Sequence, residues 1–277
     1  MSRAIVTASA SGGQVVGAPV AEYLLGFMSW QDVFLVFAAA VLALIMLLPF
    51  MRAPVAATKQ ELEESMGSIL KRAARDPSFT LIFLGFFSCG YQLAFVTAHF
   101  PAFVTEMCSP IVSGSMLDNI GVSSTSALGA VAISLIGLAN IAGTLTAGYL
   151  GKRYSKKYLL ASIYLARTFV AAAFILTPMS PATVLIFSVA MGSLWLATVP
   201  LTSGLIAHIY GLRYMGTLYG IVFFSHQLGS FLGVWLGGRM YDAYGRYTAV
   251  WWFGVCVGLF SALVPLPVRE KPLAAAA

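Results

Sequence analysis

The chain has 277 residues, of which 59% are hydrophobic and only 9% are charged. This ratio is more apolar than a water-soluble core requires, and it excludes an ordinary soluble domain. The formal net charge of +6 at pH 7 would suit a nucleic-acid-binding protein. The positions of the cations, described below, instead indicate membrane topology.

Eight long apolar stretches follow one another along the chain. A helix needs about 20 apolar residues to cross about 30 Å of hydrocarbon, and in lipid a helix satisfies its own backbone hydrogen bonds. The sequence therefore predicts an all-α membrane protein. Its eight transmembrane helices are expected at approximately 4–27, 31–50, 79–104, 125–150, 158–177, 182–207, 216–238 and 248–266.

The Lys and Arg residues gather in alternate gaps between these stretches. Of the 16 cations, the following lie on one side of the predicted membrane: Arg3, Arg52, Lys59, Lys71, Arg72, Arg75, Lys152, Arg153, Lys156, Lys157, Arg213, Arg269 and Lys271. Arg239 and Arg246 lie on the other side, and Arg167 lies inside the fifth stretch. The positive-inside rule makes both termini cytoplasmic, and we expect a bacterial inner (plasma) membrane.

The longest gap divides the spans two plus six. Residues 1–51 hold two spans, residues 52–77 form a linker, residues 78–268 hold six spans and residues 269–277 form a cytoplasmic tail. The segment ELEESMGSILKRAAR in the linker has apolar residues at helical spacing, acids first and bases last. That order suits the helix dipole and predicts an amphipathic helix on the inner membrane surface. A flexible solvated linker is the alternative.

Two spans alone do not form a domain comparable to the six that follow. The chain also enters hydrophobic sequence almost at once. We therefore expect that an N-terminal portion is missing, through truncation or a misassigned start.

Small residues recur at every fourth position in several spans. Gly229, Gly233 and Gly237 share one face of the seventh span, and Gly13 and Gly17 have the same spacing in the first. Such a face lets another helix backbone approach closely. We predict helix-to-helix contact at both places.

Arg167 is about ten residues from each end of the fifth span, so it lies near the middle of the membrane. A charge at that depth is costly and should face protein or water. Arg167 could be the counter-charge of an anionic substrate or half of a charged pair that rearranges in transport. It could also be a structural hub bonded to carbonyls or to Asn140.

Other polar residues lie within predicted spans. His226 and Gln227 are in the middle of the seventh span, and a histidine there could couple protons, bind substrate or bond neutrally between helices. His99 precedes Pro101 and could be part of a gate or a satisfied residue at a kink. Asn140 and Trp195 are further candidates for a substrate site.

The loop after the fourth span reads Gly148-Tyr-Leu-Gly-Lys-Arg-Tyr-Ser-Lys-Lys157. It resembles the G-x-L-x-D-R-x-G-R-K gating loop of the major facilitator superfamily, in the copy between helices eight and nine, with its basic half kept in Arg153, Lys156 and Lys157. Gly13-Gln-Val-Val-Gly17-Ala-Pro19 is similar to the family's helix-five pattern. The segments PLTSGLIAHIYGLRYMGTLYGIVFFSHQLGSFLGVWLGG and YDAYGRYTAVWW look like its monocarboxylate-transporter and oxalate/formate-antiporter branch.

The resemblance implies helices five to twelve of a twelve-helix transporter, that is, a six-helix C-terminal half plus two helices of the N-terminal half. It implies alternating access for a small, monocarboxylate-like organic anion, with proton symport or anion exchange. A full transport unit would then need the missing N-terminal helices or a partner subunit. The expected partners are the lipid bilayer, a small-molecule substrate and a coupling proton.

The alternatives are a drug or cation efflux transporter and a non-transporting membrane fragment or assembly partner. No nucleophile elbow, phosphate loop or metal-ligand spacing occurs in the sequence. We therefore expect no enzyme activity, no cofactor, no metal and no nucleic-acid partner.

Overall fold

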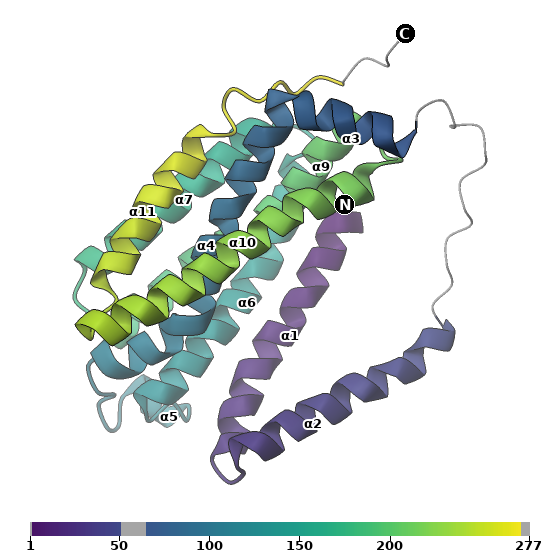
Figure 1. Ribbon diagram of the computed structural model, residues 1–277. Coiled ribbons are helices and arrows are strands. Elements are labelled where there is room, and N and C mark those ends of the chain that lie inside the picture. The colour runs from purple at the N-terminus through teal and green to yellow at the C-terminus, as the bar shows by residue number, and fades with distance from the viewer. Residues whose placement is uncertain (1, 51–64, 273–277) are drawn as a thin grey trace.

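The computed structural model describes residues 2–50 and 65–272, and all the regular secondary structure in these ranges is helical (Figure 1). In chain order, its elements are α1 (Ser2–Leu25), α2 (Trp30–Ala43), the 3-10 helix η1 (Leu44–Phe50), α3 (Met66–Arg75), α4 (Pro77–Met107), α5 (Met116–Asn119), α6 (Thr125–Leu150), α7 (Lys156–Leu176), α8 (Pro181–Leu194), α9 (Thr198–Tyr210), α10 (Met215–Tyr244) and α11 (Thr248–Leu263).

The all-helical membrane architecture predicted from the sequence is confirmed in its main feature. Six segments of the described chain are helical, long and apolar enough to cross a membrane: 30–47, 77–107, 125–150, 156–176, 181–210 and 215–244. The other two predicted spans are shorter or more polar. α11 has 16 residues, and α1 has 24 but carries four Ser or Thr residues and a glutamine.

α1 packs along α6, whereas α2 diverges from the bundle (Figure 1). Only 6% of the most apolar window of the second span is buried. The expected close approach at Gly13 and Gly17 is wrong, because a Cβ atom added at either position would meet open space. The close contact lies on the partner helix instead. A Cβ at Gly137 of α6 would come within 3.1 Å of Gln14 and Val15.

α4 and α10 share the most extensive helix-to-helix contact of the bundle. A Cβ atom added at Gly229 would overlap the Phe87 carbonyl oxygen, and one at Gly90 would overlap the His226 carbonyl oxygen. Further along α10, a Cβ at Gly233 would meet Tyr91, and one at Gly237 would come within 2.5 Å of the His99 ring. The glycines allow the two backbones to touch, which is how helices associate without a hydrophobic driving force in lipid.

The sixth predicted span is broken into α8 and α9. Residues 195–197 interrupt the helix between Gly192 and Pro200, and Pro200 has no N–H to continue it. The Leu196 N–H donates to the Asn140 side-chain oxygen at 2.8 Å. That oxygen also accepts from the Thr144 hydroxyl, while the Asn140 amide donates to Ser11 on α1. Asn140 therefore satisfies backbone that the break exposes.

One end of the bundle collects α3, the loop 151–155 and the segment after α11; we call it the basic end. Ile69 and Ala73 of α3 are buried, as an amphipathic helix requires; Glu61, Glu63 and Glu64 of its predicted acidic start lie outside the described residues. Asp76 caps α4 through the Ser78 N–H at 2.9 Å and accepts from the Tyr210 hydroxyl at 2.7 Å. α3 thus ends against the bundle.

Candidate functional site

α7 places Arg167 in the middle of the bundle, where its side chain is completely buried. Its Nη1 donates to the Cys89 Sγ of α4 at 3.3 Å, and its guanidinium carbon lies 5.9 Å from the centre of the Tyr164 ring. Nε and Nη2 have no hydrogen-bond partner. Asn140, one of the structural partners considered for Arg167, bonds to Ser11, Thr144 and Leu196 instead. Among the described residues, Arg167 contacts a thiol and a ring and no carboxylate.

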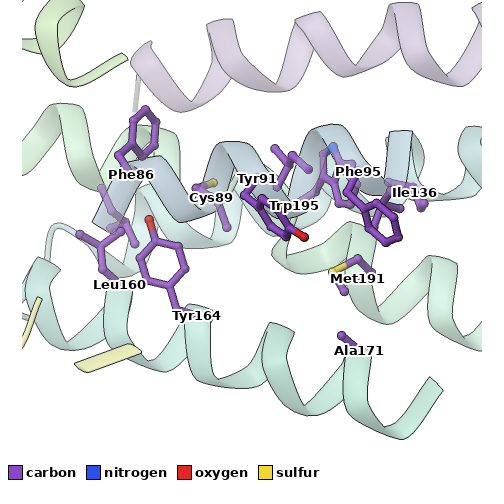
Figure 2. Close-up of a cluster of buried hydrophobic side chains, with 14 of the residues drawn as sticks. Phe86, Cys89, Tyr91, Phe95, Ile136, Leu160, Tyr164, Ala171, Met191 and Trp195 are labelled. Atoms are coloured by element: carbon purple, nitrogen blue, oxygen red, sulfur yellow. The ribbon is translucent and has the colours of Figure 1, made fainter. Parts of the chain in front are cut away.

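Cys89 joins Arg167 to the broken span. Its Sγ lies 3.3 Å from the Thr198 hydroxyl, in the first turn of α9, and both side chains are fully buried. Figure 2 shows Cys89 and Tyr164 facing each other between α4 and α7 in this core. Cys89 lies in an apolar run of the sequence, and nothing near it in the chain signals these partners. Cys89, Tyr164, Arg167, Thr198 and His226 are called the polar core cluster below.

α10 brings His226 to the same cluster, where it interacts with Cys89. Its ring stacks on Phe223 at 5.3 Å and lies 5.0 Å from Phe86. Nδ1 lies 3.4 Å from the Gln227 side-chain oxygen, a long and weak hydrogen bond. Nε2 is buried and has no partner. Arg167 and His226, chosen separately from the sequence, thus both lie near the Cys89 thiol.

Asn140 and Trp195 lie on the other side of the break from Thr198. Trp195 ends α8 and is 4% exposed, so it packs in the core rather than lining an open site. The break therefore lies between two groups of polar contacts. Asn140 bonds to Leu196 on one side, and Cys89 of the polar core cluster bonds to Thr198 on the other. A shift of α8 against α9 would change both groups together.

His99 is outside the polar core cluster. Its Nε2 lies 2.9 Å from the Val234 carbonyl oxygen of α10, and its ring packs against Phe95 and Tyr247. α4 continues through Pro101 to Met107 without a break. Here, His99 links α4 to α10 near the glycine face, which corresponds to the satisfied-histidine alternative.

The loop predicted for gating is held by a residue that the sequence analysis placed in the tail. Glu270 accepts from the Ser155 hydroxyl at 2.5 Å, from the Lys156 N–H at 3.0 Å and from the Lys156 ammonium at 3.4 Å. The Lys157 ammonium donates to the carbonyls of Leu266 and Val268. Glu270 thereby caps α7, whose own Ser155 makes no cap bond. Residues 264–270 are docked rather than free, and Val268 is fully buried. The start of the loop, after Gly148, is held by a different contact. There the Arg153 guanidinium stacks on the ring of Tyr149.

Replacing Glu270 with glutamine should loosen this end of the bundle. Partial burial alone would raise the pKa of Glu270, but the bonds from Ser155, Lys156 and Lys157 and the Lys156 charge hold it below its usual value. A carboxyl group whose pKa is lower in the folded state stabilises the fold at pH values above its unfolded-state pKa. This stabilisation is lost as the pH falls through the folded-state pKa. Glu270→Gln should cost about 1–2 kcal/mol at pH 7, measured by thermal unfolding in detergent.

The matched control is Asp242→Asn, which removes an exposed carboxylate at the opposite end. Wild type should lose stability as pH falls below about 4.3, the usual unfolded pKa of Glu. The Glu270→Gln variant should lose less over that interval. Equal acid sensitivity of the two proteins would contradict the capping role.

Comparison with known proteins places this geometry in a family. The model of the Major Facilitator Superfamily matches residues 95–276, about two thirds of the chain. The chain belongs to the major facilitator superfamily. It is an integral multi-pass membrane protein of a family whose members are generally not enzymes. The match is to the superfamily as a whole and specifies no branch.

A curated relative and two solved structures agree with this assignment. The chain is 25% identical to the "Uncharacterized MFS-type transporter YcxA" of Bacillus subtilis (strain 168), over 98% of this chain and 65% of that protein. It superposes on a crystal structure of the E. coli fucose:proton symporter FucP with a TM-score of 0.56 and 15% identity, over 88% of this chain and 60% of the other. A FucP structure in the outward conformation gives 0.57 and 16%, over 88% and 59%.

These likenesses to FucP concern the fold alone. The chain spans 65% of the length of YcxA and about 60% of the FucP chains. The polar core cluster therefore belongs to a major-facilitator helix bundle that is shorter than these relatives.

Proposed function

We propose that this chain forms part of a secondary transporter for a small organic anion, with the polar core cluster as its anion site. The main observation in support of this proposal is the buried guanidinium of Arg167. A guanidinium is always charged, and burying a charge without a partner is costly. Two of its nitrogens are unbonded in a fully buried setting, and its one hydrogen-bond acceptor is a thiol, which accepts weakly. A carboxylate would supply the missing charge and two acceptors.

His226 extends the same site. Because Nδ1 faces an oxygen that only accepts, the unbonded Nε2 would donate to the second carboxylate oxygen after it takes up a proton, and that proton would accompany the anion. Proton symport and anion exchange are the two coupling modes we consider. Gln227 contacts the other ring nitrogen and helps to set which one carries the proton.

Access to the cluster requires helix movement, because Arg167 and Thr198 are completely buried. Alternating access would provide it, with two halves rocking about a site near the midplane. The α8–α9 break lies beside the cluster and offers a place for such movement. We propose that transport is a property of a unit completed by further helices or by a partner subunit. The positive-inside rule would place the basic end in the cytoplasm.

A cation or drug efflux activity is the rival within transport. It would need an acidic or aromatic cage at the midplane, whereas the cluster has a fixed positive charge. A non-transporting assembly partner is the other rival. Such a protein has no use for an unpaired guanidinium in its core.

A thermal-shift panel on the purified protein tests the proposal directly. Formate, acetate, lactate and oxalate should raise the unfolding temperature in a concentration-dependent way, since a ligand at 100 times its Kd adds about 2.7 kcal/mol. Choline and tetraphenylphosphonium should not. Stabilisation by the cations and none by the carboxylates would overturn the anion assignment. No response to any of them, in the presence of all helices of the unit, would favour the non-transporting partner.

A further inference from the structure

We propose that an anionic phospholipid binds at the basic end of the bundle. One acyl chain would lie in a groove between α6, α7 and the α8–α9 break, and the phosphate would lie on Lys152 and Arg153. This site is separate from the polar core cluster and does not depend on what the protein transports.

The groove has a volume of about 470 Å³ and an almost entirely apolar lining. Small side chains create it, since Ala142, Gly143 and Ala147 of α6 face Ala166 of α7 and Ala197 in the break. Gly143 also lets α6 touch the backbone of Ser193. Because Ala142, Thr146 and Ser162 are exposed, the groove is open toward lipid.

The groove has the depth of one membrane leaflet. Its lining on α6 runs from Ala142 to Leu150, a helix rise of about 12 Å. Half of the hydrocarbon core is about 15 Å. An acyl chain entering at the basic end would thus reach the bilayer middle beside the break.

Positive charge lies at the mouth of the groove. Leu150 and Leu159 line its end, and the loop 151–155 connects their two helices there. Lys152 and Arg153 in this loop are exposed, and Arg153 is held with its guanidinium carbon 4.7 Å from the centre of the Tyr149 ring. The carboxylate of Glu270 is bonded at Ser155 and Lys156 instead. Two cations are therefore available for a phosphate, which is the arrangement that recognises anionic headgroups.

A second groove on the other side of α7 serves as an internal comparison. It has a volume of about 460 Å³ between α7 and α11, with Tyr158 and Leu266 at its basic end. Lys157 lies beside this groove, with its ammonium 5.1 Å from the centre of the Tyr158 ring, but it already donates to two backbone carbonyls. Because this second groove has a similar volume but its neighbouring cation is already bonded, we expect it to bind anionic and neutral lipids equally well.

The test is native mass spectrometry of the purified protein after titration with phosphatidylglycerol or phosphatidylcholine of identical acyl chains. Phosphatidylglycerol should be retained in preference, and retention should fall roughly fivefold for each cation removed in Lys152→Ala and Arg153→Ala. Ala142→Trp, which fills the groove from its exposed side, should also reduce retention. Arg246→Ala at the opposite end and Leu165→Trp in the second groove should leave it unchanged.

Two results would overturn the proposal. One is equal retention of the two lipids by the wild-type protein. The other is binding of soluble glycerol phosphate that matches phosphatidylglycerol and is unaffected by Ala142→Trp, which would make this a site for a soluble anion. If an alanine variant unfolds, Lys152→Gln and Arg153→Gln keep the side-chain length and should show the same loss of preference.

Discussion

Gly229→Ala is expected to cost about 3 kcal/mol of unfolding free energy, although it adds a single methyl group. The new Cβ would overlap the Phe87 carbonyl oxygen and lie 3.0 Å from the Tyr91 N–H nitrogen. Both atoms are backbone, so neither can rotate away, and α4 and α10 must separate along their whole contact. Overpacking of a tight interior costs about 1–3 kcal/mol, and we expect the upper end here.

Gly238→Ala is the matched control, because it lies in the same helix and its added Cβ would meet open space. Alanine is the better helix former, so this variant should be neutral or more stable by up to about 1 kcal/mol. Unfolding can be followed by labelling the buried Cys89 thiol in a background with Cys108→Ala and Cys256→Ala. Equal stability of the two glycine variants would show that α4 and α10 are not closely packed.

Gly90→Ala provides an independent check from the other helix. Its Cβ would overlap the His226 carbonyl oxygen across the same contact. Because one separation of the helices relieves both clashes, the double variant should cost less than the sum of the two single variants. Strict additivity would mean that the two glycines act at separate contacts.

Features that depend on local sequence patterns, namely the long helices and the glycine face of α10, could be predicted from the sequence. The lengths and polarity of the apolar stretches correspond to the long helices, and the spacing of four in α10 corresponds to the face that meets α4. The same spacing in α1 was misleading, because the residue that permits close contact there is Gly137 on α6. A small-residue pattern shows that a helix allows close approach; where the contact occurs depends also on the partner.

The contacts of the candidate site could not be predicted in this way. Cys89 and Arg167 are 78 residues apart, and Ser155 and Glu270 are 115 apart. Neither pair has a sequence signature, since a thiol in an apolar run reads as core and an acid after the last span reads as tail. The α8–α9 break did have a signal in Gly192 and Pro200. That signal shows where a helix can be interrupted, but not that Asn140 would satisfy the interruption.

Arg167→Met should separate function from stability more sharply than any other substitution in the chain. Methionine roughly preserves the volume and removes a buried charge that has no carboxylate partner. Replacing buried charge with well-packed apolar groups is often neutral or stabilising by about 1–4 kcal/mol. Cys89 would keep Thr198 as a partner. The unfolding free energy should therefore be unchanged or higher.

Carboxylate binding should show the opposite response to Arg167→Met. Removing one member of a buried hydrogen-bonded charge pair costs about 2–5 kcal/mol, so affinity should fall at least about 30-fold. Arg167→Lys should retain part of it, and Arg246→Met at the far end should change neither stability nor binding. A structural hub would behave in reverse, with Arg167→Met lowering stability and any remaining folded protein binding carboxylates normally. The two measurements together therefore decide whether the buried guanidinium serves the substrate or the fold.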